Sequence, residues 1–569
     1  MSVTRALAHK RLLLTGASGF LGKVWLAHLL EQLPETDLVL VLRPGGGRGA
    51  PDARAARRLV DLLETSPAFR ALRERLGPAE LAARAAARVR VVAGDLGAPG
   101  LGLGPEAREA LGAIDAVVNL AGLTDLDPPP REALDVNVQG ALDALELARS
   151  HGAALLHVST AYVAGHRQGL VRERAESDYA PCPPATGFSA RRELGDLRAL
   201  LARAEAEAND QHVASELEAQ AEAARRRLGL PGDAATRARF LQTERRRFVS
   251  ERVEGETRAR ARSWGWPNLY TQTKSLAESL LLEEAGQVPL AIARPAIVES
   301  SWRDPFPGWK EGLHTSAPIT YALSEGPLRA LPARADLVLD VIPVDLVARG
   351  LSLIAAALLA SPPSAPLVYH LGSSTQRPFP MRRVIELTAL ARRDREGPRS
   401  GPFRWRELLD LDPAASGDGL YQATLPLWRR LARGSEKVLT ELARGQGRLA
   451  DRAAKGATRA GRIARDLSSV EEAVERFRPF VLENACSFES AGVQALDAAL
   501  PDAERPSFGW DLRDLDWSRY WRQVHIPGLR EWVYPRLEGK RPARDARVAL
   551  SLDPQRLSLT EAELDRPRA

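Results

Sequence analysis

The pentapeptide Tyr270-Thr-Gln-Thr-Lys274 places a phenol and an ammonium group four residues apart. On a helix, residues at this spacing lie on one face, so the lysine can approach the tyrosine ring. A nearby positive charge stabilises the phenolate and lowers the pKa of the phenol, which makes it a usable proton donor near neutral pH. Among the eight tyrosines, only Tyr270 is followed by a lysine at the fourth position. Proton transfer is therefore the first chemistry that the sequence predicts.

A glycine-rich turn near the N-terminus supplies a second motif. Its sequence is Gly16-Ala-Ser18-Gly19-Phe20-Leu-Gly22. It follows the apolar run Leu12–Leu14 and leads into the helical pattern Val24–Leu33. Glycines between a strand and a helix let backbone N–H groups approach a pyrophosphate at the helix N-terminus. We expect Gly16 to make the tight turn, Gly19 to admit the phosphates and Gly22 to allow helix–strand packing. Together the two motifs predict hydride transfer from a dinucleotide with a proton relay.

The residue after the second apolar strand indicates which dinucleotide binds. That strand, Leu38–Leu42, is followed by Arg43. An NAD site places Asp or Glu there to hydrogen-bond the ribose 2′-hydroxyl, whereas an arginine suits the 2′-phosphate of NADP. We therefore expect NADPH as the cofactor, and no metal. The alternative interpretation of Arg43 is a surface arginine with a free guanidinium group.

Short apolar strands alternate with helical patterns over much of the chain. The predicted strands are Leu12–Leu14, Leu38–Leu42, Val89–Ala93, Ala116–Leu120, Leu155–Ser159, Leu290–Ile297, Asp340–Ile342 and Val368–Leu371. The predicted helices are Val24–Leu33, Ala53–Leu76, Ala107–Leu111, Leu134–Arg149 and Ser275–Glu284. This alternation predicts an α/β fold with a doubly wound parallel Rossmann sheet. Residues 188–262, rich in Ala, Glu and Arg, predict a helical insertion.

A chain of 569 residues is longer than one hydrophobic core usually fills, so we expect two domains. A stretch rich in Pro, Arg and Gly, Arg392–Arg404, marks the boundary. We expect an NADP-binding Rossmann reductase domain over 1–390 and a mainly helical domain over 391–569.

Composition and hydropathy limit the partners and the compartment. The net charge of +6 is small for this length, so we expect no nucleic-acid partner. Two cysteines, Cys182 and Cys486, cannot form a disulfide framework and suggest a reducing compartment. The longest apolar stretch, Leu346–Ala360, is interrupted by Arg349 and is too short to span a bilayer. No signal peptide is evident before the first strand, and a cytoplasmic protein is expected.

Residues 429–465 form a basic segment. Eleven Arg and Lys residues stand there against three acids, Glu436, Glu441 and Asp451. Such a segment can lie on an anionic membrane as a peripheral contact, form a solvated face or bind an acidic ligand. The sequence leaves all three interpretations open, and it leaves the oligomeric state unknown.

The spacing of the glycine turn is similar to that of the extended short-chain dehydrogenase/reductases. The resemblance implies that Asp95, with Leu96 after it, contacts the adenine. It implies that Ala121 and Gly122 line the nicotinamide ribose. Asn137 either braces that region or is a buried structural asparagine. Further positions that the resemblance marks are Thr160 as the catalytic hydroxyl, beside Ser159, and Pro295 as a cofactor contact.

Three further blocks resemble one branch of this superfamily, the fatty acyl-CoA reductases. The blocks begin at Asn268-Leu-Tyr270, at Arg294-Pro295-Ala-Ile-Val and at Asp340-Val-Ile-Pro343. The run Phe508–Gly528 looks like the closing block of that family's male-sterility-type domain. One departure is Leu120-Ala-Gly122, where the family usually has Cys-Ala-Ala. The resemblance is weak over 180–265 and 390–475.

The resemblance implies NADPH-dependent reduction of a long-chain acyl-CoA to a primary alcohol through an aldehyde, with release of CoA. Tyr270 and Thr160 would donate hydrogen bonds to the carbonyl oxygen, while Lys274 lowers the tyrosine pKa and holds the nicotinamide ribose. We expect an acyl channel lined by the Trp302–Trp309 segment and by Phe488; the alternative interpretation is that these aromatic rings pack in the core. Cations for the CoA phosphates could come from the insertion or from the basic segment 429–465.

Four other functions stay open at this point. The first two are an aldehyde-forming acyl-CoA reductase and a reductase of carrier-bound thioesters. The third is an NAD-dependent sugar-nucleotide epimerase or dehydratase, which Arg43 and the long insertion disfavour. The fourth is a non-catalytic NADP(H) sensor, a class that commonly lacks the Tyr/Lys pair that is intact here.

Overall fold

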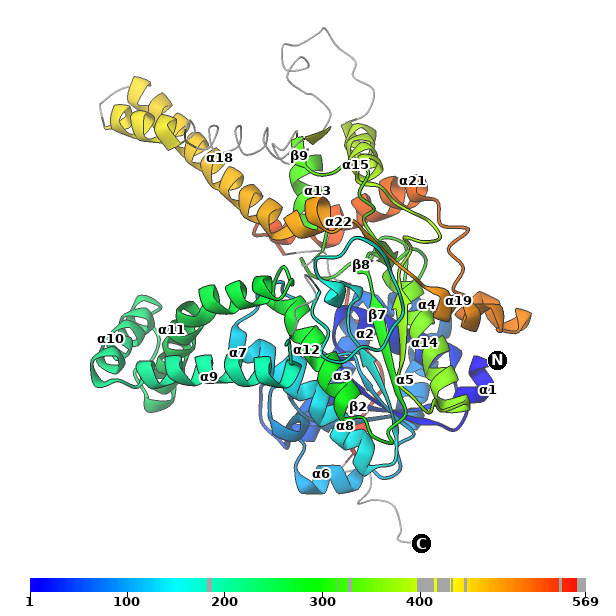
Figure 1. Cartoon of the computed structure of the whole chain (residues 1–569). Coiled ribbons are helices and arrows are strands. Elements are labelled where there is room, and N and C mark those ends of the chain that lie inside the picture. The colour runs from blue at the N-terminus through cyan, green and yellow to red at the C-terminus, as the bar shows by residue number, and fades with distance from the viewer. Residues whose placement is uncertain are drawn as a thin grey trace.

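In the computed structural model of the protein, a seven-stranded parallel sheet forms the centre (Figure 1). The model describes residues 1–181, 187–313, 315–325, 330–396, 414–416, 430, 433–444, 448–541 and 545–559. The strand order is β11-β7-β5-β4-β1-β2-β3. The strands are β1 Arg11–Thr15, β2 Asp37–Leu42, β3 Val89–Ala93, β4 Ala116–Asn119, β5 Ala154–Val158, β7 Leu290–Pro295 and β11 Leu367–Leu371. The predicted doubly wound α/β fold is confirmed.

Alternate residues of each strand face opposite sides of the sheet, and both sides are covered by helices. Leu12 and Leu14 pack into one core with α2 (Phe20–Gln32) and α14 (Val344–Ala360), whereas Leu13 packs into another with α8 and α12. Helices of this α/β part are α1 Val3–Leu7, α3 Pro51–Thr65, α4 Arg70–Leu76, α5 Pro78–Arg88, α6 Pro105–Ala110, α7 Pro130–Ala133, α8 Gly140–Ser150 and α12 Leu269–Glu284.

Two predicted helices differ from the observed ones. The single helix expected over Ala53–Leu76 is broken into α3 and α4 by the 3-10 turn Pro67–Phe69. Pro67 has no N–H to continue the ladder, and the Ser66 side chain accepts from the N–H of Ala68 to start the new turn. The helix expected over Leu134–Arg149 starts with a π-helical turn, η3 (Leu134–Gln139).

The predicted helical insertion is confirmed. Three helices form an arm that projects from the sheet, α9 (Ala190–Ala208), α10 (Gln211–Arg227) and α11 (Ala234–Ser263) (Figure 1). An apolar cluster that includes Leu197 and Val253 of the arm also contains Leu134 of η3 and Leu276 of α12, so the base of the arm packs against the α/β part. The chain returns from α11 directly into α12, so the arm separates the fifth strand of the sheet from the helix that carries Tyr270.

The C-terminal region is mainly helical, as predicted. Its helices are α15 Met381–Glu396, α18 Arg448–Arg478, α19 Ala491–Ala498, α20 Arg505–Phe508, α21 Trp517–Arg519, α22 Ile526–Trp532, α23 Tyr534–Leu537 and α24 Pro554–Leu557. Short parallel pairs connect it to the rest: β13 (Cys486–Phe488) with β6 (Gly169–Val171), and β12 (Ala414–Ser416) with β9 (Ala330–Pro332). The strand expected at Asp340–Ile342 is β10 (Val341–Pro343), which pairs with β8 (Ile297–Glu299) outside the main sheet.

Much of the expected domain boundary, Arg392–Arg404, lies outside the described residues. The division into 1–390 and 391–569 therefore stays a prediction. Cys182 also lies outside the described residues, and Cys486 is a buried free thiol. In the basic segment, the described residues are helical over 433–443 and in the first part of α18.

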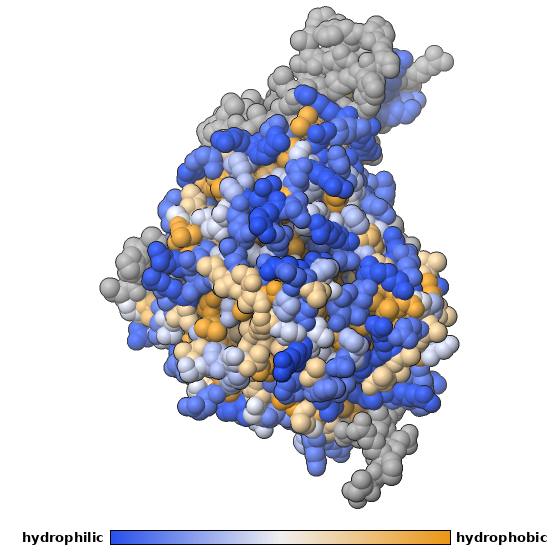
Figure 2. Space-filling view, turned by 90° about the vertical axis from the view of Figure 1, so that its right-hand side faces the viewer, coloured by the Kyte–Doolittle hydropathy of each residue, from blue (hydrophilic) through white to orange (hydrophobic). Residues whose placement is uncertain are grey.

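No helix among the described residues combines the length and the apolar composition that crossing a membrane requires. The longest predicted apolar stretch lies in α14, which is buried against the sheet and against α1 and α2. On the face shown in Figure 2, hydrophilic residues surround smaller groups of apolar ones.

Candidate active site

The largest group of predicted site residues lines one cavity of about 550 Å³. The cavity lies at the carboxyl ends of β1 and β4, where the strand order reverses from one half of the sheet to the other. In open α/β sheets this crevice is the usual ligand site, because the chain leaves neighbouring strands in opposite directions there. Predicted residues on its wall are Gly16, Ser18, Gly19, Phe20, Gly22, Arg43, Asp95, Leu96, Ala121, Gly122, Thr160, Tyr270, Lys274 and Pro295.

Two glycines of the turn after β1 admit no side chain. Gly16 has φ +75°, and a Cβ atom there would lie 2.6 Å from the backbone nitrogen of Ala121. A Cβ atom on Gly22 would lie 2.2 Å from the carbonyl oxygen of Gly16. Gly19 is the N-cap of α2 and offers no side-chain cap. The first N–H groups of α2 therefore face the cavity as an anion site of the kind that holds a dinucleotide pyrophosphate.

Two arginines flank the turn on the β2 side. Arg43 lines the cavity as expected, and Arg58, from α3, lines it beside Arg43. The Arg58 guanidinium donates to the carbonyl oxygen of Arg43 at 3.0 Å and to the Ser18 hydroxyl at 3.4 Å. Burial, and secondarily the charge of Arg43, lowers the pKa of Arg58. No sequence motif indicates Arg58, because a helix arginine fifteen positions after Arg43 belongs to no local pattern.

The loops after β3 and β4 complete the cofactor side of the cavity. Asp95 accepts from the N–H of Gly97 at 3.1 Å, which fixes the turn after β3. Asn137 is buried and does not line the cavity; its amide oxygen accepts from the N–H of Leu123 at 2.8 Å. The Asn137 amide nitrogen also donates to the Thr273 hydroxyl on α12 at 3.1 Å. Asn137 thus braces the β4 loop against the helix of Tyr270.

The glycine of the departure Leu120-Ala-Gly122 lies close to Lys274 and Asn137. A Cβ atom at this position would lie 3.0 Å from Lys274 Nζ and 3.2 Å from Asn137 Oδ1. The missing side chain gives Lys274 room beside the loop. The lysine ammonium donates to the carbonyl oxygen of Val158, at the end of β5, at 3.0 Å.

Tyr270 and Lys274 lie on the first turns of α12, and both border the cavity. The helix is capped by Asn268, whose side chain accepts from the N–H of Thr271 at 2.9 Å. Thr160 comes from the end of β5 and caps the 3-10 turn η4 (Ala161–Ala164) by accepting from the N–H of Tyr162 at 3.3 Å. The strand end and the helix start therefore bring the predicted hydroxyl, phenol and ammonium to one cavity.

The expected lowering of the tyrosine pKa by lysine is not what the structure gives. Burial raises the pKa of Tyr270 to about 12, and only a hydrogen bond with Thr160 acts in the opposite direction. Burial also lowers the pKa of Lys274 to about 8, despite the nearby charge of Glu278. The reason is geometric: Lys274 directs its ammonium to the Val158 carbonyl group.

Ser159 is a second hydroxyl on the cavity wall. It is buried, and its Oγ has no hydrogen-bond partner among the described residues, although its N–H donates to the carbonyl oxygen of Ala293. An unpartnered buried hydroxyl beside Thr160 is a ready donor to a bound oxygen. Tyr162, two residues after Thr160, also lines the cavity.

The expected acyl channel is wrong in its aromatic residues. Trp309 is buried against Phe20, with ring centroids 5.2 Å apart, and Phe488 is buried against Tyr162. Neither lines the cavity. Its apolar wall is instead formed by Leu126, Ile297, Val298, Phe477 and Phe480. Phe477 closes α18 and Phe480 follows it, so the C-terminal region supplies aromatic rings that no sequence motif indicated.

Comparison with known proteins adds the family context. The pattern of the male sterility protein family matches residues 14–351. The chain is 29% identical to "Probable fatty acyl-CoA reductase 4" of Arabidopsis thaliana over 538 residues, which cover 92% of this chain and 97% of that protein. It is 27% identical to the "Alcohol-forming fatty acyl-CoA reductase" of Simmondsia chinensis, with 94% and 99% covered.

Among solved structures, the terminal R domain from the myxalamid PKS-NRPS biosynthetic pathway aligns with a TM-score of 0.49 and 17% identity. The alignment covers 93% of this chain and 92% of that domain.

Proposed function

This chain belongs to the male sterility protein family of NAD(P)-binding oxidoreductases, and from that premise we propose that it reduces long-chain fatty acyl-CoA to a primary alcohol with NADPH. The resemblance seen in the motifs is thereby confirmed at the level of the family. Relatives named as fatty acyl-CoA reductases align over nearly the whole chain, which supports the acyl-CoA substrate. The alcohol as product and NADPH as reductant are the finer parts of the proposal.

The cavity fits a dinucleotide that carries a 2′-phosphate. Gly16 and Gly22 leave a cradle that a Cβ atom would fill, and the start of α2 presents free N–H groups. Arg43 and Arg58 place two guanidinium groups beside the β2 end, where a 2′-phosphate would lie. Asp95 and Leu96 would border the adenine, and Ala121, Gly122 and Pro295 the nicotinamide side.

When bound, NADPH supplies hydride to the acyl carbonyl carbon. Tyr270 and Thr160 donate hydrogen bonds to the carbonyl oxygen as negative charge develops on it, and Tyr270 passes the proton. Lys274, whose ammonium lies beside the β4 loop at Gly122, would hold the nicotinamide ribose. The first reduction gives a hemithioacetal, which loses CoA as the thiol and leaves an aldehyde. The second hydride and proton convert the aldehyde to the alcohol at the same residues.

One observation carries this proposal. A hydroxyl, a phenol and an ammonium (Thr160, Tyr270 and Lys274) border the same cavity as the glycine turn and the two arginines. A sensor that only binds the dinucleotide has no need for this set. The apolar wall with Phe477 and Phe480 suits an acyl chain better than a sugar nucleotide.

Product analysis tests the proposal. The purified protein is incubated with palmitoyl-CoA and either NADPH or NADH, while cofactor oxidation, free thiol and extracted lipids are measured together. We expect two NADPH consumed for each CoA released, hexadecanol as the product and much slower oxidation of NADH.

The other outcomes separate the alternatives. One NADPH per CoA with free hexadecanal identifies an aldehyde-forming reductase. Reduction of a carrier-bound thioester in preference to palmitoyl-CoA identifies the carrier-bound acyl thioester as the substrate. No oxidation with any thioester contradicts the proposal.

A further inference from the structure

A second pocket, which we call the anion pocket, lies next to the wall that carries Thr160. Its volume is about 250 Å³, and its lining includes Val163 and Ala164. These residues belong to η4, whose N-cap Thr160 and whose Tyr162 line the catalytic cavity. Arg294 lines the anion pocket too, whereas the next residue of β7, Pro295, lines the catalytic cavity. The two pockets therefore share a wall at two points.

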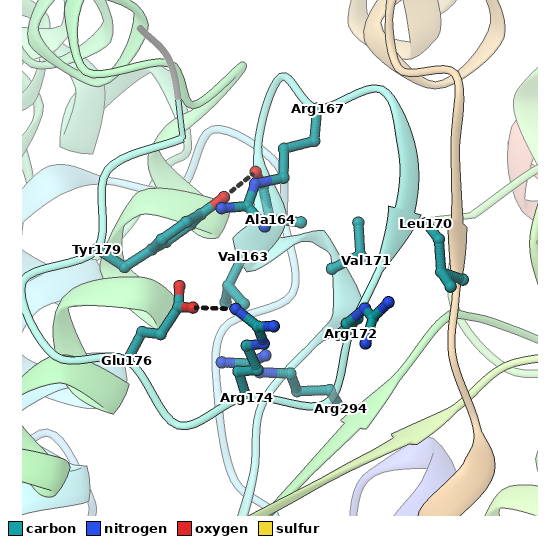
Figure 3. A pocket seen from close by; sticks show the side chains of 10 residues that line it. All are labelled: Val163, Ala164, Arg167, Leu170, Val171, Arg172, Arg174, Glu176, Tyr179 and Arg294. Atoms are coloured by element: carbon teal, nitrogen blue, oxygen red, sulfur yellow. Dashed lines mark hydrogen bonds and ion pairs between the residues drawn. The ribbon is translucent and has the colours of Figure 1, made fainter. Parts of the chain in front are cut away.

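Four of the ten residues that line the anion pocket are arginines, and only one is acidic. The arginines are Arg167, Arg172, Arg174 and Arg294, and the acid is Glu176 (Figure 3). Within the part of the chain that the structure describes, Arg167 and Arg172 form no ion pair. Arg174 approaches Glu176 only at 4.0 Å. The pocket thus holds more positive charge than its own carboxylate can balance.

Two further carboxylates close to these arginines in the fold are directed elsewhere. Glu278 pairs with Arg294 through both oxygens, with Arg294 Nε 3.1 Å from Oε1 and Nη2 2.5 Å from Oε2, and fixes that guanidinium in place. Glu173 turns its oxygens to the N–H groups of His370 and Gly492, both at 2.7 Å. A free anion would therefore meet Arg167, Arg172 and Arg174 before any of these acids.

The anion pocket is held in shape by contacts with distant parts of the chain. The Arg167 guanidinium stacks over the Tyr179 ring at 4.6 Å, and the Tyr179 hydroxyl donates to the carbonyl oxygen of Ala164 at 2.8 Å. Leu170, on the rim, lies in β6, which pairs with β13 of the C-terminal region. Figure 3 shows the chain that follows η4, over residues 165–181, curving around these side chains.

We infer that the anion pocket binds the phosphate groups of the CoA moiety, an inference that rests on the proposed function. CoA carries its phosphates at the end of the pantetheine arm away from the thioester, so they need cations beside the catalytic cavity but outside it. The glycine turn, Arg43 and Arg58 already serve the phosphates of the dinucleotide. Among the described residues of the insertion and of the basic segment 429–465, both considered as CoA contacts from the sequence, none lines either pocket.

A comparison of two substrates tests the inference. The double variant Arg167→Ala/Arg172→Ala is assayed with palmitoyl-CoA and with hexadecanal, which undergoes the same hydride transfer but has no CoA. We expect kcat/KM for palmitoyl-CoA to fall about tenfold or more, because charge-assisted contacts to phosphate are lost. For hexadecanal kcat/KM stays within about twofold of the wild type. Arg227→Ala, an exposed arginine at the end of α10, serves as the control and should change neither value.

Three outcomes overturn the inference: unchanged kinetics with palmitoyl-CoA, an equal loss with both substrates, or an equal loss in the control. Calorimetric binding of CoA alone gives a readout without turnover, and an unchanged Kd in the double variant also overturns it. If the wild type does not reduce palmitoyl-CoA at all, the proposed function fails, and the calorimetric comparison still decides whether the pocket binds CoA.

Discussion

Lys274 lies in an environment that disfavours its charge. Its ammonium is buried and donates to one backbone carbonyl group, and its pKa falls to about 8 because of burial. Near neutral pH most of the lysine is still protonated, so it can hold a ribose hydroxyl and an oxyanion. The low pKa also makes the residue responsive to the groups that a bound cofactor brings.

The first prediction concerns stability and pH in the absence of cofactor. The folded pKa of Lys274 is about 8, below its usual 10.5, so between these values the unfolded chain binds more protons than the folded one. Stability should therefore rise with pH across this window, by up to about 3 kcal/mol. Urea unfolding of the wild type and of Lys274→Met gives the free energy of unfolding of each at every pH between 7.5 and 10. We expect the wild-type value minus the variant value to rise with pH, because the contributions of all other titrating groups cancel in this difference. A difference that stays constant with pH contradicts the assignment.

Arg58 lines the proposed cofactor site although it belongs to none of the sequence motifs that predicted this site. It donates to the Arg43 carbonyl group and to the Ser18 hydroxyl, which places the Arg58 guanidinium group at the end of β2. Burial and, secondarily, the positive charge of Arg43 lower the pKa of Arg58, and an anion bound between or beside the two arginines would relieve this repulsion.

The second prediction follows from that pair. Arg43→Ala/Arg58→Ala should raise the KM for NADPH by about 100-fold or more, because each charged hydrogen bond contributes about 1.5–3 kcal/mol and the double variant loses two of them. The KM for NADH should change little, since NADH has no 2′-phosphate. Arg57→Ala, on the same helix with its guanidinium on the Arg48 carbonyl group, is the matched control. Equal losses for both cofactors would show that the arginines do not read the 2′-phosphate.

At the scale of elements, the start of α2 and the start of α12 position the chemistry. The turn at Gly16 to Gly22 brings the N-terminus of α2 against the β4 loop, and Asn137 ties that loop to α12. The glycine turn depends on the absence of side chains, and the tie between the β4 loop and α12 depends on the single amide group of Asn137. Small substitutions at these positions should therefore disturb the site without altering any charged residue.

The third prediction tests the turn. Gly22→Ala places a Cβ atom 2.2 Å from the Gly16 carbonyl oxygen, so α2 must shift. We expect the NADPH Kd to rise by at least about tenfold and the midpoint of unfolding to fall. In Gly104→Ala the new Cβ atom meets nothing within 4 Å, and the Kd should stay at the wild-type value. Tight NADPH binding by Gly22→Ala, measured by fluorescence titration, would contradict the proposed pyrophosphate position.

The elements that the sequence predicted well are those whose residues are close in the chain. The glycine turn, the Tyr270 helix and most of the strands depend on short periodic patterns, and they lie where these patterns place them. The prediction of one helix over Ala53–Leu76 was wrong at Pro67, because the apolar periodicity continues through this residue although the helix does not. The prediction of the aromatic lining was wrong for another reason. Trp309 and Phe488 are buried in the core, and hydropathy alone does not distinguish an aromatic ring in the core from one that lines a cavity.

Residues from distant parts of the chain were not predictable in the same way. Arg58, Phe477 and Phe480 reach the cavity only because α3 and the end of α18 fold back onto the sheet. The arginines of the anion pocket lie in a loop without a recognisable motif, and their convergence depends on the pairing of β6 with β13. Such contacts require the tertiary arrangement.

On the scale of the whole molecule, one apolar core crosses the predicted boundary between 1–390 and 391–569. It includes Leu12 and Leu14 of the sheet together with Trp510 and Trp521 of the C-terminal region. A buried cluster at the same junction joins Glu299 to Lys310 at 3.1 Å, with His525 3.9 Å away. The C-terminal region therefore packs as part of the reductase core.

The fourth prediction tests this shared core. Tryptophan fluorescence and far-UV circular dichroism should report one unfolding transition with a common midpoint. Glu299→Ala should lower the free energy of unfolding by about 3–5 kcal/mol, because it leaves Lys310 buried without its partner. Glu80→Ala, which removes an exposed i,i+4 pair with Arg84, should cost about 0.5 kcal/mol or less. Two separate transitions, with Glu299→Ala shifting only one, would establish independently folding domains.

The most direct test of the whole account is the turnover of Tyr270→Phe with palmitoyl-CoA and NADPH, measured on the sample whose NADPH affinity has been determined. Loss of one donor to the developing oxyanion costs about 3 kcal/mol, so kcat should fall by about a hundredfold or more while the NADPH Kd stays close to the wild-type value. A variant that turns over at nearly the wild-type rate would contradict the assignment of Tyr270 as the proton donor.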